Sequence, residues 1–423
     1  MNQLLLLIIM FFYSGWLQNS NLVLKGEVVA AKTGEPVPYV NIFLKSSEVR
    51  LISNAEGKFS LVLATKHLTD TLLFSCIGFE PLAVTVQDLL KDKKTVKRVY
   101  LHESVASLQE VRVTPLNARQ IIERGIARIP DNYGGASYQA EGFYRHAVKE
   151  NGTFASLIES VVNVYNTDFN VQKGVGVAYR KTRLSHDYRQ YQPALKPDLM
   201  QNALGLDHVR YGRGFLNQNN LGNWQFKLTG YTQIDKQEVY IIKASLPNAQ
   251  NQDVHQALIY VRAEDYAFLK IDYDYNWKTE NLKGEPFRTD TIKYKKYSWK
   301  GTFSYMPYRN KMVLNYFHFT LKQKIYAQTY VTVSSGRMKT TKDLASQELH
   351  EEFILNNIQF SGKGGAIASV GKASDLYQNA IPYDRNFWQQ YPKPIDSKLY
   401  QAVKADLEKR APLEKQFGQA LVD

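Results

Sequence analysis

The sequence predicts a mainly β protein, in which an N-terminal β-sandwich precedes a larger antiparallel β-rich domain, curved as a half-barrel, with a few helices. Short apolar runs separated by turn residues recur at roughly ten-residue intervals in residues 22–115. Longer segments of strand pattern follow between residues 138 and 357. The density of Phe, Trp and Tyr is more than twice as high in residues 116–423 as in residues 21–115, which marks a boundary between the two parts.

The chain of 423 residues is too long for one ordinary core, and its apolar content of 44% excludes a disordered chain. We therefore expect four parts. These are a signal peptide (1–20), the sandwich (21–115), a β-rich domain with an N-terminal helix (116–361) and a tail with a short helix (362–423).

Residues 4–13 form a compact apolar stretch, followed by Ser14 and Gly15. Its length suits the hydrophobic core of a signal peptide better than a membrane span. No Lys or Arg precedes the stretch and no small-x-small cleavage site follows it, so an uncleaved membrane anchor remains an alternative. No cysteine follows it either, which argues against a lipid-anchored lipoprotein. We expect an exported protein, periplasmic or associated with the outer membrane.

The net charge is +13, and all but +2 of it falls in residues 116–423. A basic surface can face nucleic acid, anionic lipid, lipopolysaccharide phosphate or water. No run of five like charges occurs, so we expect no nucleic-acid partner, while association with a membrane surface stays open. Cys76 is the single cysteine, which excludes an intramolecular disulfide. Its apolar strand context predicts a buried filler rather than a nucleophile.

Turn and strand residues alternate through the predicted sandwich. Gly34 permits a turn, and Asn54 to Gly57 form a hairpin before Phe59. Gly78 allows a tight bend or a bulge. The strands are expected within 22–29, 40–44, 58–61, 72–77 and 96–101, and the segment 108–114 leads into the next domain.

In this order the motifs closely resemble the carboxypeptidase-regulatory-like domain, a transthyretin-like sandwich. Such domains often stand at the N-terminus of outer-membrane nutrient transporters and other exported proteins of certain Gram-negative bacteria. The resemblance covers under a quarter of the chain and implies a fold and a cell-envelope compartment, without a reaction. A metallocarboxypeptidase needs zinc ligands in a separate domain, commonly a His-x-x-Glu pair. None of the eight histidines has this spacing, and His67 with Asp70 comes nearest, so we expect no metal and no cofactor.

The larger region begins with a predicted helix. Ile121, Ile122, Ile126 and Ile129 form one apolar stripe over residues 116–129, which Pro130 ends. The stripe is typical of a helix packed on a sheet. Strands are predicted at 138–148, 154–165, 224–229, 238–244, 257–262, 267–277, 290–299, 311–321, 325–334 and 352–357. In the tail, residues 382–392 predict an ordered aromatic turn and residues 399–410 a short helix.

The rhythm of strands and short polar turns in residues 226–272 resembles the antiparallel half-barrel of periplasmic lipoprotein-sorting carriers. This resemblance implies a concave face that holds an apolar ligand. Period-two alternation assigns six side chains to that face, and two more join it if a bulge separates them. The six are Trp224, Phe226, Tyr240, Ile242, Leu258 and Tyr260, and the two are Phe268 and Ile271. Alternatively, the aromatic side chains fill a β-core, or the helix at 116–129 occupies the face.

Cations and aromatic residues interleave in 294–300 and 305–309. This pattern suits a surface that stacks on sugars, binds lipid headgroups or makes cation–π contacts, and equally a strand with one packed and one wet face. In the tail, Tyr383-Asp384 and Phe387-Trp388 resemble a pattern found in uncharacterised envelope proteins that carry the same sandwich. The whole chain resembles that group.

The sequence contains no nucleophile elbow, no triad order and no metal-ligand spacing. We therefore expect a non-enzymatic exported binding or scaffold protein of the cell envelope, which holds an apolar ligand or an outer-membrane partner. One alternative is an envelope hydrolase that uses a carboxylate pair, Asp272 with Asp274 or Glu264 with Asp265. Another is an accessory protein of a nutrient transporter, which would interact with a receptor.

Overall fold

The computed structural model describes residues 21–46, 50–91, 94–104, 116–134, 137–166, 175–192, 199–247, 254–277, 285–287, 292–333, 336–360, 383–391 and 393–419. The predicted signal peptide at 1–20, the connecting segment at 108–114 and the start of the tail at 362–382 lie outside these residues. The expectations for these three segments therefore stay predictions.

The N-terminal sandwich consists of two sheets that face each other across an apolar core. One sheet has the order β4-β1-β7, with β1 (Asn21–Ala30), β4 (Lys58–Ala64) and β7 (Val96–Leu101). The other has the order β3-β2-β5-β6, with β2 (Asn41–Leu44), β3 (Arg50–Ile52), β5 (Thr71–Ser75) and β6 (Leu82–Thr85). Only the β1–β7 pair is parallel. Alternate side chains, among them Val28, Phe59 and Phe74, fill the core, and η1 (Thr65–His67) and α2 (Val86–Lys91) lie in the connections.

Two sequence predictions for the sandwich can be checked at single residues. Gly57 has a φ of +68°, and a Cβ atom there would lie 2.4 Å from the Val28 carbonyl oxygen, so the predicted hairpin requires glycine. Cys76 is half-buried and packs against the sandwich core. Burial raises the pKa of its thiol to about 11, which suits a packing role.

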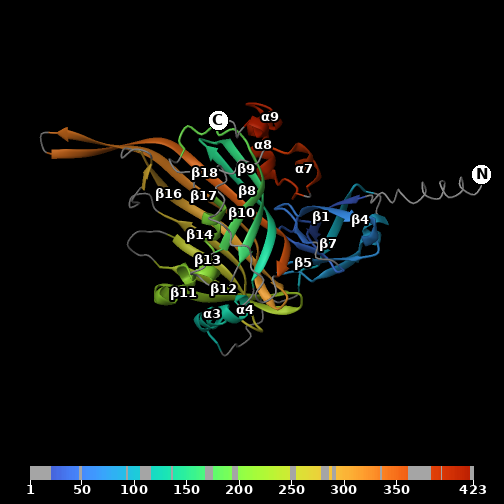
Figure 1. Ribbon diagram of the computed structural model, residues 1–423. Coiled ribbons are helices and arrows are strands. Elements are labelled where there is room, and N and C mark those ends of the chain that lie inside the picture. The colour runs from blue at the N-terminus through green and yellow to red at the C-terminus, as the bar shows by residue number, and fades with distance from the viewer. Residues whose placement is uncertain are drawn as a thin grey trace, which may run out of the picture.

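The larger region forms one antiparallel, unclosed sheet with the strand order β10-β9-β8-β18-β17-β16-β14-β13-β12-β11, and β15 pairs with β16 beside this path. The sheet confirms the predicted mainly β fold (Figure 1). Its strands are β8 (Tyr138–Glu150), β9 (Thr153–Asn166), β10 (Val175–Leu184), β11 (Gln225–Ile234), β12 (Gln237–Leu246), β13 (Val254–Arg262), β14 (Phe268–Asn276), β15 (Glu285–Phe287), β16 (Ile292–Tyr308), β17 (Lys311–Val333) and β18 (Gly336–Phe360). Beyond Ala327, β17 and β18 continue as a two-stranded arm that projects from the sheet (Figure 1).

Three hairpins of this sheet turn within two residues, and both residues of each turn have positive φ. The turns are Asn151-Gly152, Asp235-Lys236 and Arg309-Asn310. Positive φ at both central positions matches the right-handed twist of the flanking strands. Only the first turn has the Asn-Gly pair that favours this geometry, so the other two carry a weaker sequence signal.

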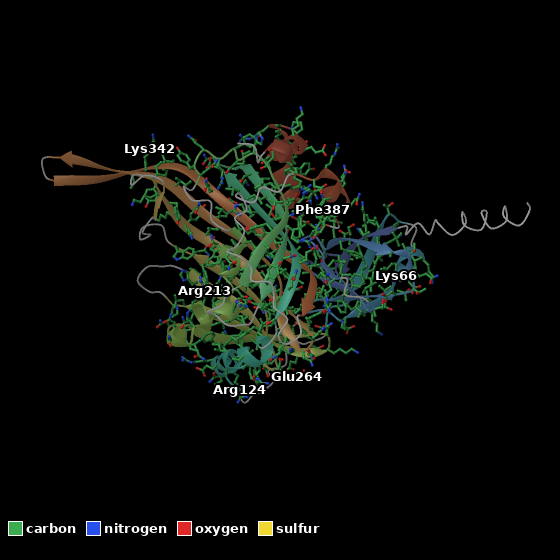
Figure 2. The ribbon with its side chains drawn as sticks, in the orientation of Figure 1. Lys66, Arg124, Arg213, Glu264, Lys342 and Phe387 are labelled. Carbon is green, nitrogen blue, oxygen red and sulfur yellow. The ribbon has the colours of Figure 1, made fainter. Side chains whose placement is uncertain are left out.

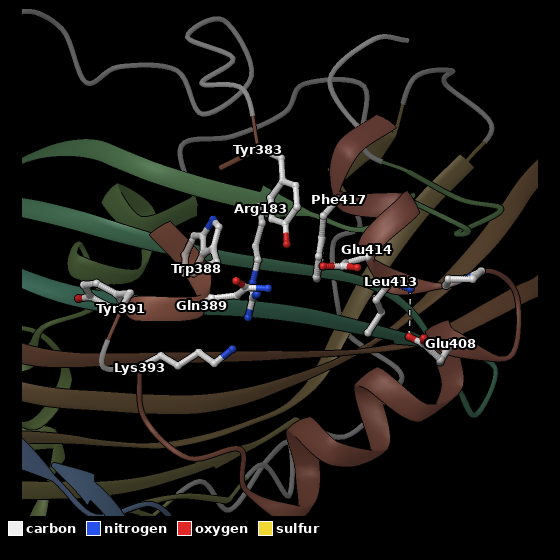
Figure 3. A pocket seen from close by; sticks show the side chains of 11 residues that line it. Arg183, Tyr383, Trp388, Gln389, Tyr391, Lys393, Glu408, Leu413, Glu414 and Phe417 are labelled. Atoms are coloured by element: carbon white, nitrogen blue, oxygen red, sulfur yellow. Dashed lines mark hydrogen bonds between the residues drawn. The ribbon is translucent and has the colours of Figure 1, made fainter. Parts of the chain in front are cut away.

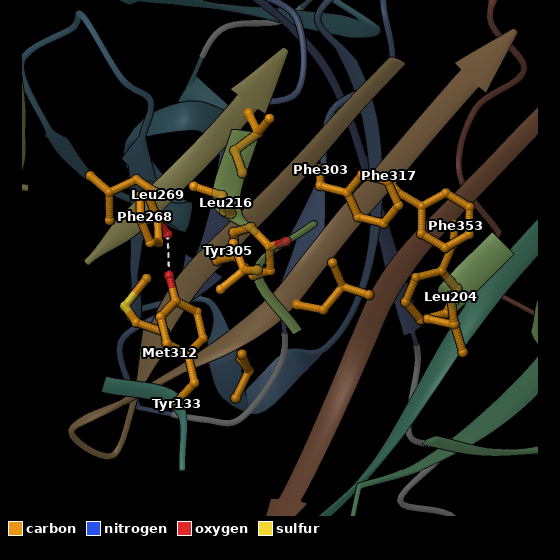
Figure 4. Packing of buried hydrophobic residues seen from close by; sticks show 14 of the residues in the cluster. Tyr133, Leu204, Leu216, Phe268, Leu269, Phe303, Tyr305, Met312, Phe317 and Phe353 are labelled. Carbon is orange, nitrogen blue, oxygen red and sulfur yellow. Dashed lines mark hydrogen bonds between the residues drawn. The ribbon is translucent and has the colours of Figure 1, made fainter. Parts of the chain in front are cut away.

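Helices cover one side of the sheet, which we call the inner face. They are α3 (Ala118–Ala127), α4 (Ile129–Tyr133), α5 (Leu199–Leu204), α6 (His208–Tyr211), η2 (Gly214–Leu216) and η3 (Gln218–Asn223). Gly125 lets α3 approach the sheet closely, because a Cβ atom there would lie 2.6 Å from the Phe268 ring. Phe303, Phe317 and Phe353 lie directly opposite one another on three strands and continue the core (Figure 4).

The opposite side, which we call the outer face, carries both ends of the described chain. The sandwich lies against it, and β3 of the sandwich contacts β18 (Figure 1). The C-terminal helices α7 (Arg385–Gln390), α8 (Lys398–Glu408) and α9 (Leu413–Gln419) lie beside the sandwich on the same face, where α8 packs on β9 and α9 on β10. The sandwich and the C-terminal helices therefore lie next to each other over β8, β9 and β18.

Several predicted elements need correction. The strands predicted at 311–321 and 325–334 are one 23-residue strand, β17, because the pairing with β16 and β18 continues through the polar residues between them. The strand β10 and the helices between residues 199 and 223 were not predicted. The aromatic turn predicted at 382–392 contains the helix α7, which Asp384 caps by accepting a hydrogen bond from the Phe387 N–H. The tail helix predicted at 399–410 is α8, within two residues at each end.

Candidate functional site

A row of mostly polar side chains crosses the outer face, and strand register places its members directly opposite one another. We call it the ionic row. It consists of Asp272, Thr302, His318, Glu352, Arg145, Glu159 and Arg183, from β14, β16, β17, β18, β8, β9 and β10 respectively. Charged residues rarely occupy buried strand positions unless they are paired. The row is therefore the first place on this sheet to look for function.

Arg145 is the centre of the row. Its Nε donates to Glu159 Oε1 over 2.9 Å, and its guanidinium also bonds Asp396 Oδ1 at 2.5 Å and lies 3.5 Å from Glu352 Oε2. The Tyr400 ring lies 4.4 Å from the guanidinium carbon. One cation thus joins the sheet to the segment that leads into α8.

Glu159 is fully buried, and three cationic side chains surround its carboxylate. Arg183 Nε donates to its Oε2 over 2.7 Å, Arg145 binds its Oε1, and Lys404 Nζ lies 3.4 Å from Oε1. Burial alone would raise the pKa of this carboxyl. The charges of Lys404, Arg183 and Arg145 outweigh burial and hold the pKa well below its ordinary value, so Glu159 is ionised.

Glu352 is more weakly compensated than Glu159. Burial raises the pKa of its carboxyl, although the charge and hydrogen bond of Arg145 act in the opposite direction. Burial also lowers the pKa of the next member of the row, His318, to about 4, so its imidazole is neutral near pH 7. The row is therefore less charged at His318 and Glu352 than at the Arg145–Glu159 pair.

The sandwich reaches the row through Tyr39. Its ring stacks on Tyr316 and on His318, with centroids 4.9 and 4.7 Å apart. Tyr39 has a φ of +54°, a left-handed conformation that costs free energy for a residue with a side chain. The two stacked contacts place the Tyr39 ring directly against the sheet.

Further contacts surround Tyr39 on both sides. Asn315 Nδ2 donates to Asn41 Oδ1 over 2.6 Å, and the Arg50 guanidinium lies 4.9 Å from the Tyr308 ring centre. The sandwich also touches the C-terminal segment, because the Lys398 N–H donates to Glu56 Oε1 over 3.0 Å. These contacts make the sandwich, the sheet and the C-terminal helices into one connected junction.

Most of the predicted ligand face lies on the inner face, within the core. Trp224, Ile242, Phe268 and Ile271 are buried there, and Phe226 and Tyr240 pack against the same cluster. The bulge required between Phe268 and Ile271 exists, because the register with β13 skips Leu269. The helices described above cover this surface, as the alternative of a filled face predicted.

The assignment of Leu258 and Tyr260 to the inner face is wrong. They pair with Lys243 and Ile241, whereas their neighbour Ile259 pairs with the buried Ile242. Side chains alternate along a strand, so both lie on the outer face, where Leu258 is 37% exposed. Leu258 lines a shallow outer pocket of about 320 Å³ with Asp272 and Asp274.

Three of the four carboxylates considered for a hydrolase have a cation beside them, and Glu264 accepts a hydrogen bond from Gln237 Nε2 over 2.9 Å. Asp272 lies 2.9 Å from Lys270 Nζ, Asp274 lies 2.9 Å from Lys300 Nζ, and Asp265 makes a paired contact with Arg262. Asp272 and Asp274 share the outer face of β14. Among the described residues, no group of three or more His, Cys, Asp and Glu side chains could hold a metal ion.

Sequence reasoning missed Arg145, Glu159 and Arg183. Each stands in a strand directly beside an apolar or aromatic residue, which is Tyr144, Ile158 and Leu184 respectively. A charged residue at this kind of position signals a buried pair. The partner could not be named, because the pairing requires the register of β8, β9 and β10.

A larger pocket of about 450 Å³ opens at the Arg183 end of the row, between β10, α7 and α9 (Figure 3). Its walls include Trp388, Tyr391, Lys393 and Phe417. None of these residues was singled out as a site by the sequence, although Phe387-Trp388 was noted as a pair.

The fold and this junction define a β-sandwich module fixed to a large antiparallel sheet. Residues 24–113 match the family model described as CarboxypepD_reg-like domain, which confirms the resemblance of the N-terminal region. No curated protein matches the sequence. In the part of the chain that the structure describes, no helix has the length and apolarity needed to cross a membrane.

Two solved structures are similar over much of their length, at low TM-scores. A DUF1329 family protein from Desulfovibrio piger has 9% identity and a TM-score of 0.23, with 58% of this chain and 93% of that chain covered. A protein of unknown function from Bacteroides fragilis, described as membrane-associated, has 9% identity and a TM-score of 0.15, with 81% and 99% covered. At these scores neither likeness carries an assignment.

Proposed function

We propose that this protein is a non-catalytic, exported scaffold of the cell envelope that holds its sandwich domain in a fixed orientation for an envelope partner. The observation that carries the proposal is the junction at Tyr39. Tyr39 is strained and stacks on two rings, while its neighbours in the sandwich, Asn41 and Glu56, accept hydrogen bonds from the sheet and from the C-terminal segment, which suits a module held in one orientation.

The compartment rests on the sequence. The apolar stretch at residues 4–13 and the match of residues 24–113 to the CarboxypepD_reg-like domain both support export to the periplasm or the outer membrane. The non-catalytic role is supported by the state of the buried charges. Arg145 and Glu159 neutralise each other across the strands, and removing one partner of such a buried pair is strongly destabilising.

An apolar ligand on the inner face has less support than the scaffold role. Helices occupy that surface, and Phe268 lies against Gly125 and Tyr133 with no exposed area. We therefore do not extend the proposal to an acyl-chain carrier.

Photo-crosslinking in cells tests the scaffold role. A photo-crosslinking residue would replace Tyr100, which is 50% exposed on the sandwich. We expect a discrete adduct in the envelope fraction that disappears when Tyr39→Ala frees the sandwich. The control Arg119→Gln, an exposed position on α3, should leave the adduct unchanged. A cytosolic location would contradict the proposal, as would hydrolysis of an envelope substrate by the purified protein that Asp272→Asn abolishes.

A further inference from the structure

The pocket at the Arg183 end of the ionic row has the size and lining of a small-molecule site. Its volume of about 450 Å³ lies in the range of ligand pockets. Three aromatic side chains, Tyr383, Tyr391 and Phe417, form walls on different sides (Figure 3). Aromatic walls of this kind stack on flat or sugar-like groups.

One end of the pocket is cationic. The Arg183 guanidinium lies between two rings, 4.5 Å from the centre of Trp388 and 4.9 Å from that of Phe417. The Lys393 side chain reaches toward Arg183 from the adjoining segment (Figure 3). Among the described residues, no carboxylate or carbonyl oxygen accepts a hydrogen bond from Lys393 Nζ.

The charges around this end do not balance. The cations Arg145, Arg183, Lys393 and Lys404 face the carboxylates Glu159, Glu352 and Asp396. Lys393 is the cation in excess, and burial together with repulsion from Arg183 lowers its pKa to about 8. An uncompensated cation in a half-buried pocket is costly, and a bound anion would remove that cost.

A buried donor lies on the side of Trp388 that faces away from Lys393 (Figure 3). Trp388 is 2% exposed, and within the described chain its Nε1 atom has no hydrogen-bond partner. Buried donors are nearly always paired in folded proteins. Since Trp388 lines the pocket, a ligand oxygen there would satisfy this donor.

The other end of the pocket is acidic. Glu408 accepts a hydrogen bond from the Leu413 N–H over 3.0 Å, and Glu414 pairs with Arg385 at 2.6 Å. Both line the pocket. These groups accept hydrogen bonds from hydroxyls and repel a second anion, so the pocket is polarised from cationic to acidic.

We propose that this pocket binds a sugar-sized polyhydroxylated molecule that carries one phosphate group. The phosphate contacts Lys393 and Arg183, the ring stacks on the aromatic walls, one hydroxyl oxygen accepts from Trp388 Nε1, and the other hydroxyls donate to the acidic end. The phosphate sugar is either free in solution or the headgroup of a lipid. This site does not depend on the scaffold role.

Calorimetric titration of the purified full chain tests the proposal. The probes are glucose 6-phosphate, glucose, and inorganic phosphate, and phosphatidylcholine vesicles with and without phosphatidylinositol 4-phosphate test the lipid source. We expect saturable binding of the sugar phosphate or of the phosphoinositide vesicles, weaker binding of inorganic phosphate and none of glucose. Whichever of the first two binds identifies the source.

Matched variants assign that binding to the pocket. Lys393→Gln should weaken it about tenfold or more, since a charge-assisted contact is lost. Trp388→Phe keeps the ring, removes the donor and should weaken binding several-fold, which provides a second test if Lys393→Gln fails to fold. Lys66→Gln, on the sandwich away from the large sheet, should have no effect (Figure 2). Absence of saturable binding to both phosphorylated probes, or binding that both pocket variants leave unchanged, would overturn the proposal.

Discussion

The Nε atom of Arg145 donates to Oε1 of Glu159 over 2.9 Å, and the two side chains are 1% and 0% exposed. The residues stand opposite each other on β8 and β9. Because Arg145 also binds Asp396, which precedes α8, this pair connects the sheet to the C-terminal helices.

Arg145→Met should lower the free energy of unfolding by roughly 3–5 kcal/mol, because it removes one bond to Glu159 and takes away the cation that pairs with the buried Glu352. Urea denaturation followed by circular dichroism measures this. The control Arg119→Met removes an exposed ion pair with Glu123 and should cost at most about 0.5 kcal/mol. Equal costs for the two variants would show that the row is not a structural link.

Stability should fall as the pH is lowered from about 6.5 to 4. Burial lowers the pKa of His318 to about 4, against about 6.5 in an unfolded chain. Between these values the unfolded state binds more protons, so acid favours unfolding. His318→Gln should reduce this loss by up to about 3 kcal/mol. Urea midpoints across this range measure it, with exposed His102→Gln as control. A curve that His318→Gln leaves unchanged would contradict the assignment.

Two residues predicted for the same face should differ strongly in how much their replacement by alanine destabilises the protein. Phe268 is fully buried on the inner face, so Phe268→Ala should cost roughly 3–5 kcal/mol. Leu258 lies on the outer face and is 37% exposed, so Leu258→Ala should cost about 0.5 kcal/mol or less. Denaturant unfolding compares the variants. Saturable binding of a fluorescent fatty acid that Phe268→Ala abolishes without unfolding the protein would contradict the conclusion that the inner face is a filled core.

Tyr39→Ala should uncouple the sandwich from the large sheet, because the stacks on Tyr316 and His318 are lost. Scanning calorimetry of the intact chain should then show the sandwich melting separately, at a lower temperature than the sheet. Tyr100→Ala, which alters an exposed ring on the same module, should leave the wild-type profile in place. Identical profiles for both variants would argue against a junction at Tyr39.

Binding of glucose 6-phosphate should take up protons near pH 8 and weaken above it. Burial, Arg183 and Lys404 lower the pKa of Lys393 to about 8, although Glu159 and Asp396 act in the opposite direction. A bound phosphate favours the charged amine, so affinity falls as that proton is lost. Tyr383, Tyr391, Glu408 and Glu414 also face the pocket.

Titrations in two buffers of different ionisation enthalpy measure this proton uptake. Lys393→Gln should abolish it, and Lys66→Gln should retain it. An affinity that stays constant from pH 7 to 9 in the wild-type protein would show that Lys393 does not contact the bound phosphate.

Local patterns were enough to predict the sandwich. The turn at Gly57 and the alternation around Phe59 depend on neighbours in sequence, and both are present. The helix at 116–129 was likewise visible in its isoleucine stripe, although Pro130 begins a second short helix rather than ending the helical segment.

The register between strands that are distant in the sequence could not be predicted. The faces of Leu258 and Tyr260 were assigned wrongly because an apolar pair at period two fits either side of a strand, and pairing with Lys243 and Ile241 decides between them. The ionic row depends most strongly on this long-range register. Arg145, Glu159 and Glu352 are separated by up to about two hundred residues, and two antiparallel pairings in register, β8 with β9 and β8 with β18, bring them together.

The orientation of the sandwich on the sheet is the central claim, and a distance distribution between the two modules tests it most directly. Spin labels would be attached at Lys66→Cys on the sandwich and Lys409→Cys after α8, in a Cys76→Ala background. Pulsed electron spin resonance should give one narrow distribution for this protein and a broad one after Tyr39→Ala. A distribution that is already broad with Tyr39 in place would contradict a fixed sandwich.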